Sequence, residues 1–125
     1  MGLYRSQDRE AAVDLYAAAM KRELEANEYK GDPAKVSPEE LTSELIGHLQ
    51  KLLWMVHQRH SDDGAAMWSS PYINARILEY AADIGNLAMF MAHNAECLNE
   101  ATLKNRTVEK DYVPPPWNWE FQGDY

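Results

Sequence analysis

Apolar residues recur at helical spacing near the start of the chain. Between residues 6 and 29 they stand at Val13, Tyr16, Met20 and Leu24. Spacings of three and four residues place such positions on one face of a helix. The sequence Lys30-Gly31-Asp32-Pro33 follows, in which the glycine suits a left-handed helix end and the proline cannot continue a helix. We therefore predict a first helix from Ser6 to about Tyr29.

A second helix is marked by its start. The segment Ser37-Pro38-Glu39-Glu40 combines an N-cap serine, a proline at the first helical position and a glutamate at the third. Apolar residues then recur three and four apart, at Leu41, Leu45, Leu49, Leu52 and Val56. The pattern ends near His60, where Ser61-Asp62-Asp63-Gly64 predicts a turn.

The same kind of start introduces a third helix, which we expect from Ser69-Ser70-Pro71 to about Leu98. Its apolar positions are Ile73, Ile77, Tyr80, Ile84, Leu87 and Met91. Small residues stand among them, at Ala81, Ala82, Gly85, Ala88 and Ala92. Small side chains allow close helix approach on more than one side, as inside a bundle or at an oligomer interface.

The last twenty residues differ in character from the rest. They include the segment Tyr112-Val113-Pro114-Pro115-Pro116-Trp117-Asn118-Trp119, which favours an extended, polyproline-like chain lying across a neighbouring surface. No strand pattern or internal repeat is evident in the sequence. We therefore predict an all-α domain over residues 1–105 and an extended tail over residues 106–125. Three helices seldom close a core alone, so we expect a homo-oligomer.

Composition narrows the function classes. With 125 residues, 46% of them hydrophobic and 26% charged, the chain fits one globular domain. Twelve Lys and Arg against twenty Asp and Glu give a net charge of -8, which disfavours nucleic-acid binding. No apolar run approaches the ~20 residues of a membrane span. Because Cys97 is the single cysteine and no apolar signal segment opens the chain, we expect a cytoplasmic protein.

Acidic pairs at helical spacing are the first candidate chemistry. Glu40 and Glu44 share a face of the second helix, and Glu79 and Asp83 share a face of the third. Carboxylates that converge from adjacent helices are suitable ligands for Mg²⁺. The first pair is typical of a solvated helix face. Glu79 and Asp83 interrupt a long apolar run, where a charge must face water or a partner, so they are the stronger candidates.

Three segments of the chain resemble a known family. The run Ile77-Leu78-Glu79-Tyr80-Ala81-Ala82-Asp83-Ile84-Gly85-Asn86-Leu87-Ala88-Met89-Phe90 resembles a segment of MazG-like all-α nucleoside triphosphate pyrophosphatases, especially small phage and archaeal members. Upstream, the Tyr16–Met20 segment and Lys30-Gly31 look like the family's first helix and its ending, and residues 41–52 fall on its second helix. The resemblance implies an oligomeric fold and Mg²⁺-dependent cleavage of a nucleoside triphosphate to a monophosphate and pyrophosphate.

The chain departs from the family at the metal-binding positions. The resemblance places the family's E-x-x-E pair on His48 and Lys51, and its E-x-x-D pair on Tyr80 and Asp83. Only Asp83 keeps a carboxylate at these four positions. An ammonium at Lys51 repels Mg²⁺, but together with a protonated His48 it offers positive charge to a phosphate group. We therefore interpret this region as a binding pocket that has lost its metal.

We therefore predict that the protein binds a nucleotide or another phosphorylated small molecule between helices, without efficient hydrolysis and without a cofactor. The expected ligand-binding residues are Lys30, His48, Lys51, Tyr80, Asp83 and Asn86. Asp83 and Asn86 would orient polar groups of the ligand, while the cationic side chains would meet its phosphates. In a virus, such a protein would sequester a nucleotide signal.

Two alternatives remain open at this point. In the first, Glu44, Glu79 and Asp83 hold Mg²⁺ and the protein is a nucleoside triphosphate pyrophosphohydrolase. In the second, the Pro-rich, Trp-bearing tail docks on a partner protein while the pocket is inert. No nucleophile motif is present, so the sequence names no catalytic residue. Trp54 and Trp68 are a further candidate, as surfaces for stacking a nucleobase.

Overall fold

The chain is all-helical over the residues that the computed structural model describes, which are 2–61 and 68–105. The elements are α1 (Ser6–Ala26), η1 (Glu28–Lys30), η2 (Pro33–Lys35), α2 (Pro38–Arg59), α4 (Ser70–Asn94) and α5 (Glu100–Lys104). No strand occurs in these two ranges. The prediction of an all-α fold built on three main helices is confirmed.

The first helix ends three residues earlier than the pattern predicts, at Ala26. The carbonyl of Glu23 accepts two hydrogen bonds from Asn27, one from its backbone N–H at 3.1 Å and one from its side-chain amide at 2.8 Å. Two short 3-10 turns, η1 and η2, then connect α1 to α2 and were not predicted. Gly31 lies between them with φ of 97°, the left-handed backbone that its glycine was expected to supply.

Both helices with a predicted serine–proline start are capped by a serine. The Oγ of Ser37 accepts from the backbone N–H of Glu40 at 3.2 Å, and the Oγ of Ser69 accepts from that of Tyr72 at 3.3 Å. The third helix ends at Asn94 rather than near Leu98, and the short α5 follows it. Most of the predicted turn at 61–64, and the whole predicted tail at 106–125, lie outside the described residues.

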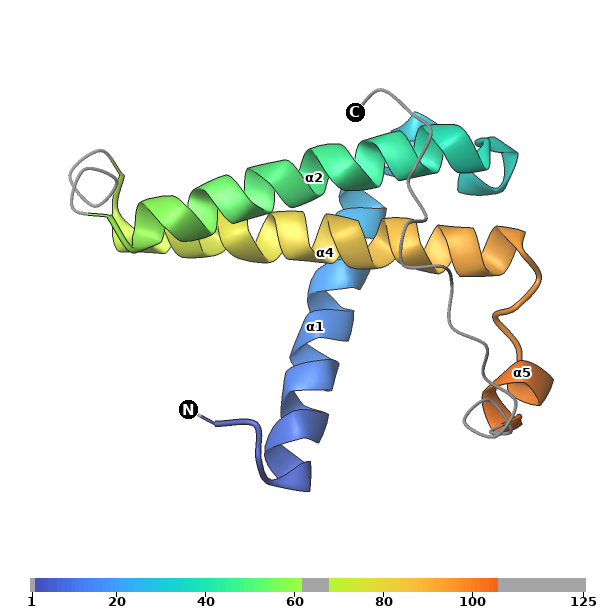
Figure 1. Ribbon diagram of the computed structural model, residues 1–125, viewed down its shortest axis with the longest axis horizontal. Helices are drawn as coiled ribbons and strands as arrows, with labels where there is room; N and C mark the ends of the chain where they lie inside the picture. The colour runs from blue at the N-terminus through green and yellow to red at the C-terminus, as the bar shows by residue number, and fades with distance from the viewer. Residues whose placement is uncertain (1, 62–67, 106–125) are drawn as a thin grey trace, which may run out of the picture.

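Helices α2 and α4 run antiparallel, side by side along the long axis of the molecule (Figure 1). Large apolar side chains on these two helices form most of the core, and their exposed fractions are 2% for Leu41, 5% for Met55, 2% for Ile73 and 6% for Leu87. At one end of the pair, the guanidinium of Arg59 donates to the side-chain oxygen of Asn74. The pair is therefore a hairpin joined mainly by apolar packing.

Helix α1 crosses α4 steeply and extends away from the pair (Figure 1). Ala19 is its one buried residue. Two hydrogen bonds fix the crossing: the hydroxyl of Tyr16 donates to the carbonyl of Ala81, and the amide of Asn86 donates to the carbonyl of Met20 at 3.0 Å. A Cβ atom at Gly85 would lie only 2.5 Å from the Tyr16 hydroxyl, so a larger residue there would force the Tyr16 side chain, and its hydrogen bond, to shift.

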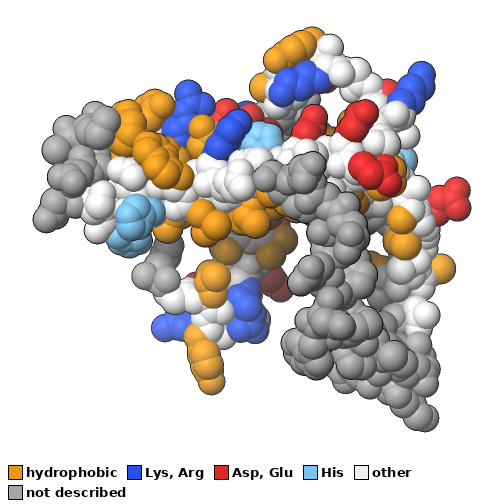
Figure 2. All heavy atoms as spheres, turned by 45° about the horizontal axis from the view of Figure 1, so that its top comes forward, with side chains coloured by type: hydrophobic (Ala, Val, Ile, Leu, Met, Phe, Trp, Pro, Cys, Tyr) orange, Lys and Arg blue, Asp and Glu red, His pale blue; other side chains and the backbone are white. Residues whose placement is uncertain are grey.

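Many large hydrophobic side chains stay exposed on the single chain. On the three main helices they are Val13, Leu15, Tyr16, Leu49, Leu53, Trp54, Tyr72 and Leu78. Figure 2 shows hydrophobic side chains gathered along the outside of the helix pair. Within the described ranges, no helix has both the length and the apolar character needed to cross a membrane.

Candidate functional site

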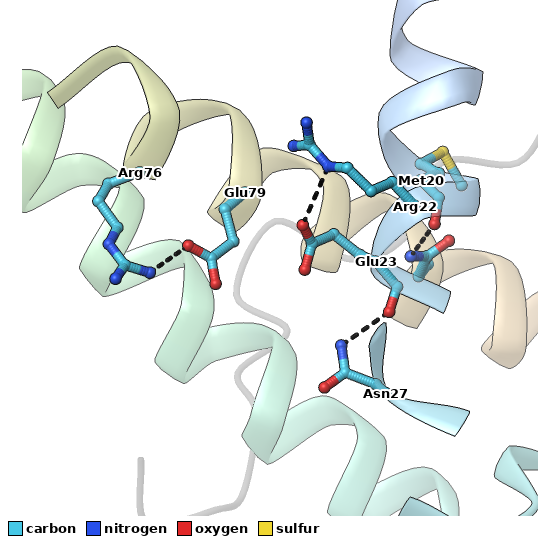
Figure 3. A network of polar contacts seen from close by, with 7 residues as sticks. Met20, Arg22, Glu23, Asn27, Arg76 and Glu79 are labelled. Atoms are coloured by element: carbon cyan, nitrogen blue, oxygen red, sulfur yellow. Dashed lines mark hydrogen bonds and ion pairs between the residues drawn. The ribbon is translucent and has the colours of Figure 1, made fainter. Parts of the chain in front are cut away.

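Three carboxylates from two helices meet beside the α1 crossing. One oxygen atom from each of Glu23, Glu79 and Asp83 lies within 4.8 Å of the others, and we call these residues the acidic group. Glu79 and Asp83 are four residues apart and therefore share a face of α4. Glu23 lies one turn after Met20, whose carbonyl accepts a hydrogen bond from the side-chain amide of Asn86 on α4. In Figure 3, Glu23 reaches from α1 toward Glu79.

Burial and mutual repulsion act on these carboxylates. Burial raises the pKa of Glu23, and the neighbouring Asp83 and Glu79 raise it further. Burial also raises the pKa of Asp83, with His48, Lys30 and Lys51 acting to lower it and Glu79 acting to raise it. A shared cation would relieve the repulsion among the three carboxylates.

Each member of the acidic group also has a basic side chain as a neighbour. The Nε atom of Arg22 lies 3.6 Å from an oxygen of Glu23, and Arg76 forms an ion pair with Glu79 (Figure 3). On the α2 side, the Nδ1 atom of His48 lies 3.6 Å from an oxygen of Asp83. That nitrogen is buried and has no hydrogen-bond partner, so it is an available polar atom facing the acidic group.

Four of the predicted ligand-binding residues lie together where α2 faces α4. His48 approaches Asp83, and its ring centroid lies 6.3 Å from that of Tyr80. The ammonium of Lys51 lies 5.9 Å from the centroid of the Tyr80 ring, within the range of a cation–π contact. The structure therefore brings His48, Lys51, Tyr80 and Asp83 to one place between α2 and α4.

The other two predicted ligand-binding residues, Lys30 and Asn86, lie in different environments. Lys30 is exposed at the end of η1, and its charge acts on Asp83. Asn86 is only 5% exposed, and its amide is committed to the carbonyl of Met20. Asn86 therefore joins α4 to α1 beside the acidic group, and its Oδ1 atom has no hydrogen-bond partner.

The acidic group differs from the predicted metal ligands in one member. Glu79 and Asp83 belong to it, while Glu44 is an exposed residue of α2 outside it. The third member of the acidic group is Glu23, which was not predicted from the sequence. The signal was present, because Glu23 stands three residues after Met20 and seven after Tyr16, on the apolar face of the first helix.

Chemically, the acidic group could hold a divalent metal ion. Carboxylate oxygens are the ligands that Mg²⁺ and Mn²⁺ prefer, and Mg²⁺ usually completes its shell with water and substrate phosphates. The nearby Arg22, Arg76, His48 and Lys51 would offer positive charge to such phosphates. Two open cavities of about 460 and 470 Å³ lie elsewhere, near α5, and no member of the acidic group lines either of them.

No protein-family model, curated protein sequence or solved structure matches this chain.

Proposed function

We propose that the protein binds a nucleotide or another phosphorylated small molecule together with a divalent cation, between α1, α2 and α4. The acidic group carries the proposal, because three carboxylates from two helices converge within 4.8 Å and two of them are destabilised as anions. A cation bound among them removes that repulsion. The resemblance to MazG-like pyrophosphatases supports the same class of ligand.

Glu23 changes the metal-free interpretation of the sequence. At the four family positions, the residues of α2 are His48 and Lys51, and only Asp83 on α4 is acidic. Glu23 and Glu79 supply two further carboxylates around Asp83. These carboxylates support a metal held by α1 and α4, and in this proposal His48 and Lys51 of α2 face the phosphates.

The basic neighbours of the acidic group support binding of the phosphates and the metal as one complex. Arg22 and Arg76 form ion pairs with Glu23 and Glu79, and His48 lies beside Asp83. A bound cation would neutralise the carboxylates instead and leave these side chains to pair with an anion. Binding of the cation should therefore strengthen binding of the phosphates, and the reverse by linkage.

Hydrolysis is the second candidate function, and the acidic group is the observation that favours it. A bound Mg²⁺ would polarise the phosphate chain and lower the pKa of a bound water. Attack of that water on the α-phosphorus, with cleavage of the bond to the oxygen that bridges to the β-phosphorus, yields a nucleoside monophosphate and pyrophosphate. Release of pyrophosphate from a nucleoside triphosphate in Mg²⁺ distinguishes this activity from binding alone.

We also propose that the protein works in the cytoplasm as a homo-oligomer. Each of α1, α2 and α4 exposes large apolar residues. A second copy related by a two-fold axis can cover these residues with its own. Sedimentation should find a dimer or larger species. A Leu53→Asp substitution, at a side chain that is 61% exposed, should shift the protein toward the monomer.

The binding proposal is tested by thermal melting and calorimetric titration of the full chain with Mg²⁺, pyrophosphate and a nucleotide panel, each repeated in EDTA. A ligand that binds only the folded state raises the melting temperature. We expect Mg²⁺ and pyrophosphate together to raise it by more than the sum of their separate effects. A shift that is unchanged in EDTA would instead support the metal-free pocket.

Matched variants locate the site. Glu23→Gln should weaken cation binding at least about tenfold, because it removes one of three charged ligands. Lys51→Ala should weaken pyrophosphate binding with a smaller effect on the cation alone. Glu44→Gln removes a carboxylate outside the acidic group and should leave both affinities unchanged. The proposal fails if neither Mg²⁺ nor any phosphate compound changes the melting temperature.

A further inference from the structure

An aromatic residue extends the acidic group along α4. Tyr72, Arg76, Glu79 and Asp83 follow one another at spacings of four, three and four residues, so they form one stripe on the helix. The guanidinium carbon of Arg76 lies 5.4 Å from the centroid of the Tyr72 ring, and the same guanidinium pairs with Glu79. Arg76 thus connects an aromatic ring to a possible metal ligand.

The ring lies at a useful distance from the carboxylates. Seven residues separate Glu79 from Tyr72, which corresponds to roughly 10 Å along a helix. That span is comparable to the reach of a nucleotide from its phosphate chain to its base. Tyr72 is 44% exposed, so its ring is open to a ligand from solution.

We propose that Tyr72 is the stacking surface for the base of a nucleotide whose phosphates and cation occupy the acidic group. This inference rests on the proposed function and identifies the phosphorylated ligand as one that carries an aromatic base. Stacking on a single ring accepts every base, so Tyr72 selects nucleotides as a class and does not distinguish strongly among bases.

Arg76 would change both of its partners when the nucleotide binds. The base takes the face of the Tyr72 ring that the guanidinium now covers, and the cation takes the carboxylate of Glu79. The released guanidinium then pairs with the phosphates, for which its planar set of donors is well suited. Each contact that Arg76 gives up is replaced by a contact of the ligand, so the exchange leaves no charged group unpaired.

The test compares a ligand with a base to one without it, by calorimetric titration of the full chain in Mg²⁺. Tripolyphosphate is the base-free probe, and a non-hydrolysable nucleoside triphosphate analogue is the other. We expect the nucleotide to bind roughly tenfold more tightly, which is typical of one base stacked on one aromatic side chain. Tyr72→Leu should remove that difference, and Tyr72→Phe should preserve it.

Two readouts separate stacking from a general effect on the fold. Tripolyphosphate affinity should not fall in Tyr72→Leu, because the substitution removes only a ring contact that Arg76 gives up when it pairs with phosphates. Tyr4→Leu, at a ring that is 94% exposed on the N-terminal segment, should change neither affinity. The base protons of the bound nucleotide should shift upfield in NMR spectra with wild type and Tyr72→Phe, and not with Tyr72→Leu.

The failures are distinguishable. If tripolyphosphate binds but the nucleotide binds no more tightly, or if Tyr72→Leu leaves the nucleotide affinity unchanged, the stacking inference is wrong and the proposed function stands. If neither compound binds in Mg²⁺, both the proposed function and this inference are wrong.

Discussion

Helix α4 contacts its two neighbours in different ways. Toward α2 the interface is long and apolar, and the large buried side chains on the two helices are Leu41, Met55, Ile73 and Leu87. Toward α1 the interface is short: Tyr16 and Met20 pack against Gly85, and two hydrogen bonds cross it. The stability gained from apolar packing is proportional to the apolar area that is buried. The α1 crossing buries little apolar area, and its hydrogen bonds mainly fix the geometry of the contact.

The acidic group depends on the weaker of these two interfaces, the one between α1 and α4. Glu79 and Asp83 belong to α4 and are held with the α2–α4 pair, but Glu23 arrives on α1. A helix held by few apolar contacts opens at low cost in free energy. Binding of a cation by residues of both helices would therefore stabilise the α1 crossing, and loss of the crossing would abolish the three-carboxylate site.

The largest effect on stability is expected from a substitution in the apolar interface between α2 and α4. Ile73→Ala removes a side chain that is 2% exposed and should lower the free energy of unfolding by about 2–5 kcal/mol. Urea denaturation measures this loss. Leu103→Ala, at a side chain that is 78% exposed on α5, is the control and should stay within about 0.5 kcal/mol of the wild type. Equal losses in the two variants would contradict the assignment of Ile73 to the core.

A smaller effect is expected at the α1 crossing, where two glycines allow a matched test. At Gly47 of α2 an added Cβ meets nothing within 4 Å, so Gly47→Ala should stabilise the protein by about 0.5–1 kcal/mol. At Gly85 the added Cβ collides with Tyr16, and overpacking of about 1–3 kcal/mol outweighs the helical gain. Gly85→Ala should therefore destabilise the protein by about 1 kcal/mol.

The two glycine variants should also differ in cation affinity. Gly85→Ala displaces α1, and Glu23 with it, so calorimetry should find weaker binding of Mg²⁺ or Mn²⁺. Gly47→Ala should bind the cation like the wild type. Hydrogen exchange of the α1 amides should accelerate in Gly85→Ala alone. Stabilisation by both alanines would show that the crossing is not as tight as the structure indicates.

Much of the fold was accessible from local sequence signals. The serine caps at Ser37 and Ser69, and the helical spacing of the apolar residues, predicted α2 and α4 to within a few residues at most ends. These signals act within one turn of a helix, and sequence spacing records them directly. The steep crossing of α1 was not predicted, because it depends on Gly85 meeting Tyr16, two residues 69 positions apart.

The site was predictable only where it lies on one helix or on helices packed along their length. Glu79 and Asp83 stand out as charges within an apolar run, and His48 was placed beside Asp83 through the family resemblance. Glu23 and Arg76 were missed, since their roles depend on the α1 crossing and on side-chain directions that the spacing does not report. Glu44 was chosen in place of Glu23 because its helix was expected to face the same site.

The smallest effect is expected from the charge of Glu23 itself, through pH. Burial and two neighbouring carboxylates raise the pKa of Glu23, so the folded protein holds this proton more tightly than the unfolded chain. The resulting stability is complete below the ordinary pKa of a glutamate, about 4.3. It is lost as the pH rises from there through the raised pKa of the folded state.

Glu23→Gln isolates this contribution, because glutamine resembles the protonated side chain at every pH. In EDTA, the free energy of unfolding of Glu23→Gln should match that of the wild type at low pH and exceed it as the pH rises through the acidic range. Glu25→Gln, an exposed position on the same helix outside the acidic group, controls for the loss of one negative charge. In saturating Mg²⁺ the order of wild type and Glu23→Gln should reverse, since the wild type keeps all three carboxylates as ligands and Glu23→Gln keeps two. A wild type that stays less stable than Glu23→Gln at neutral pH with Mg²⁺ present would argue against a cation site that joins α1 to α4.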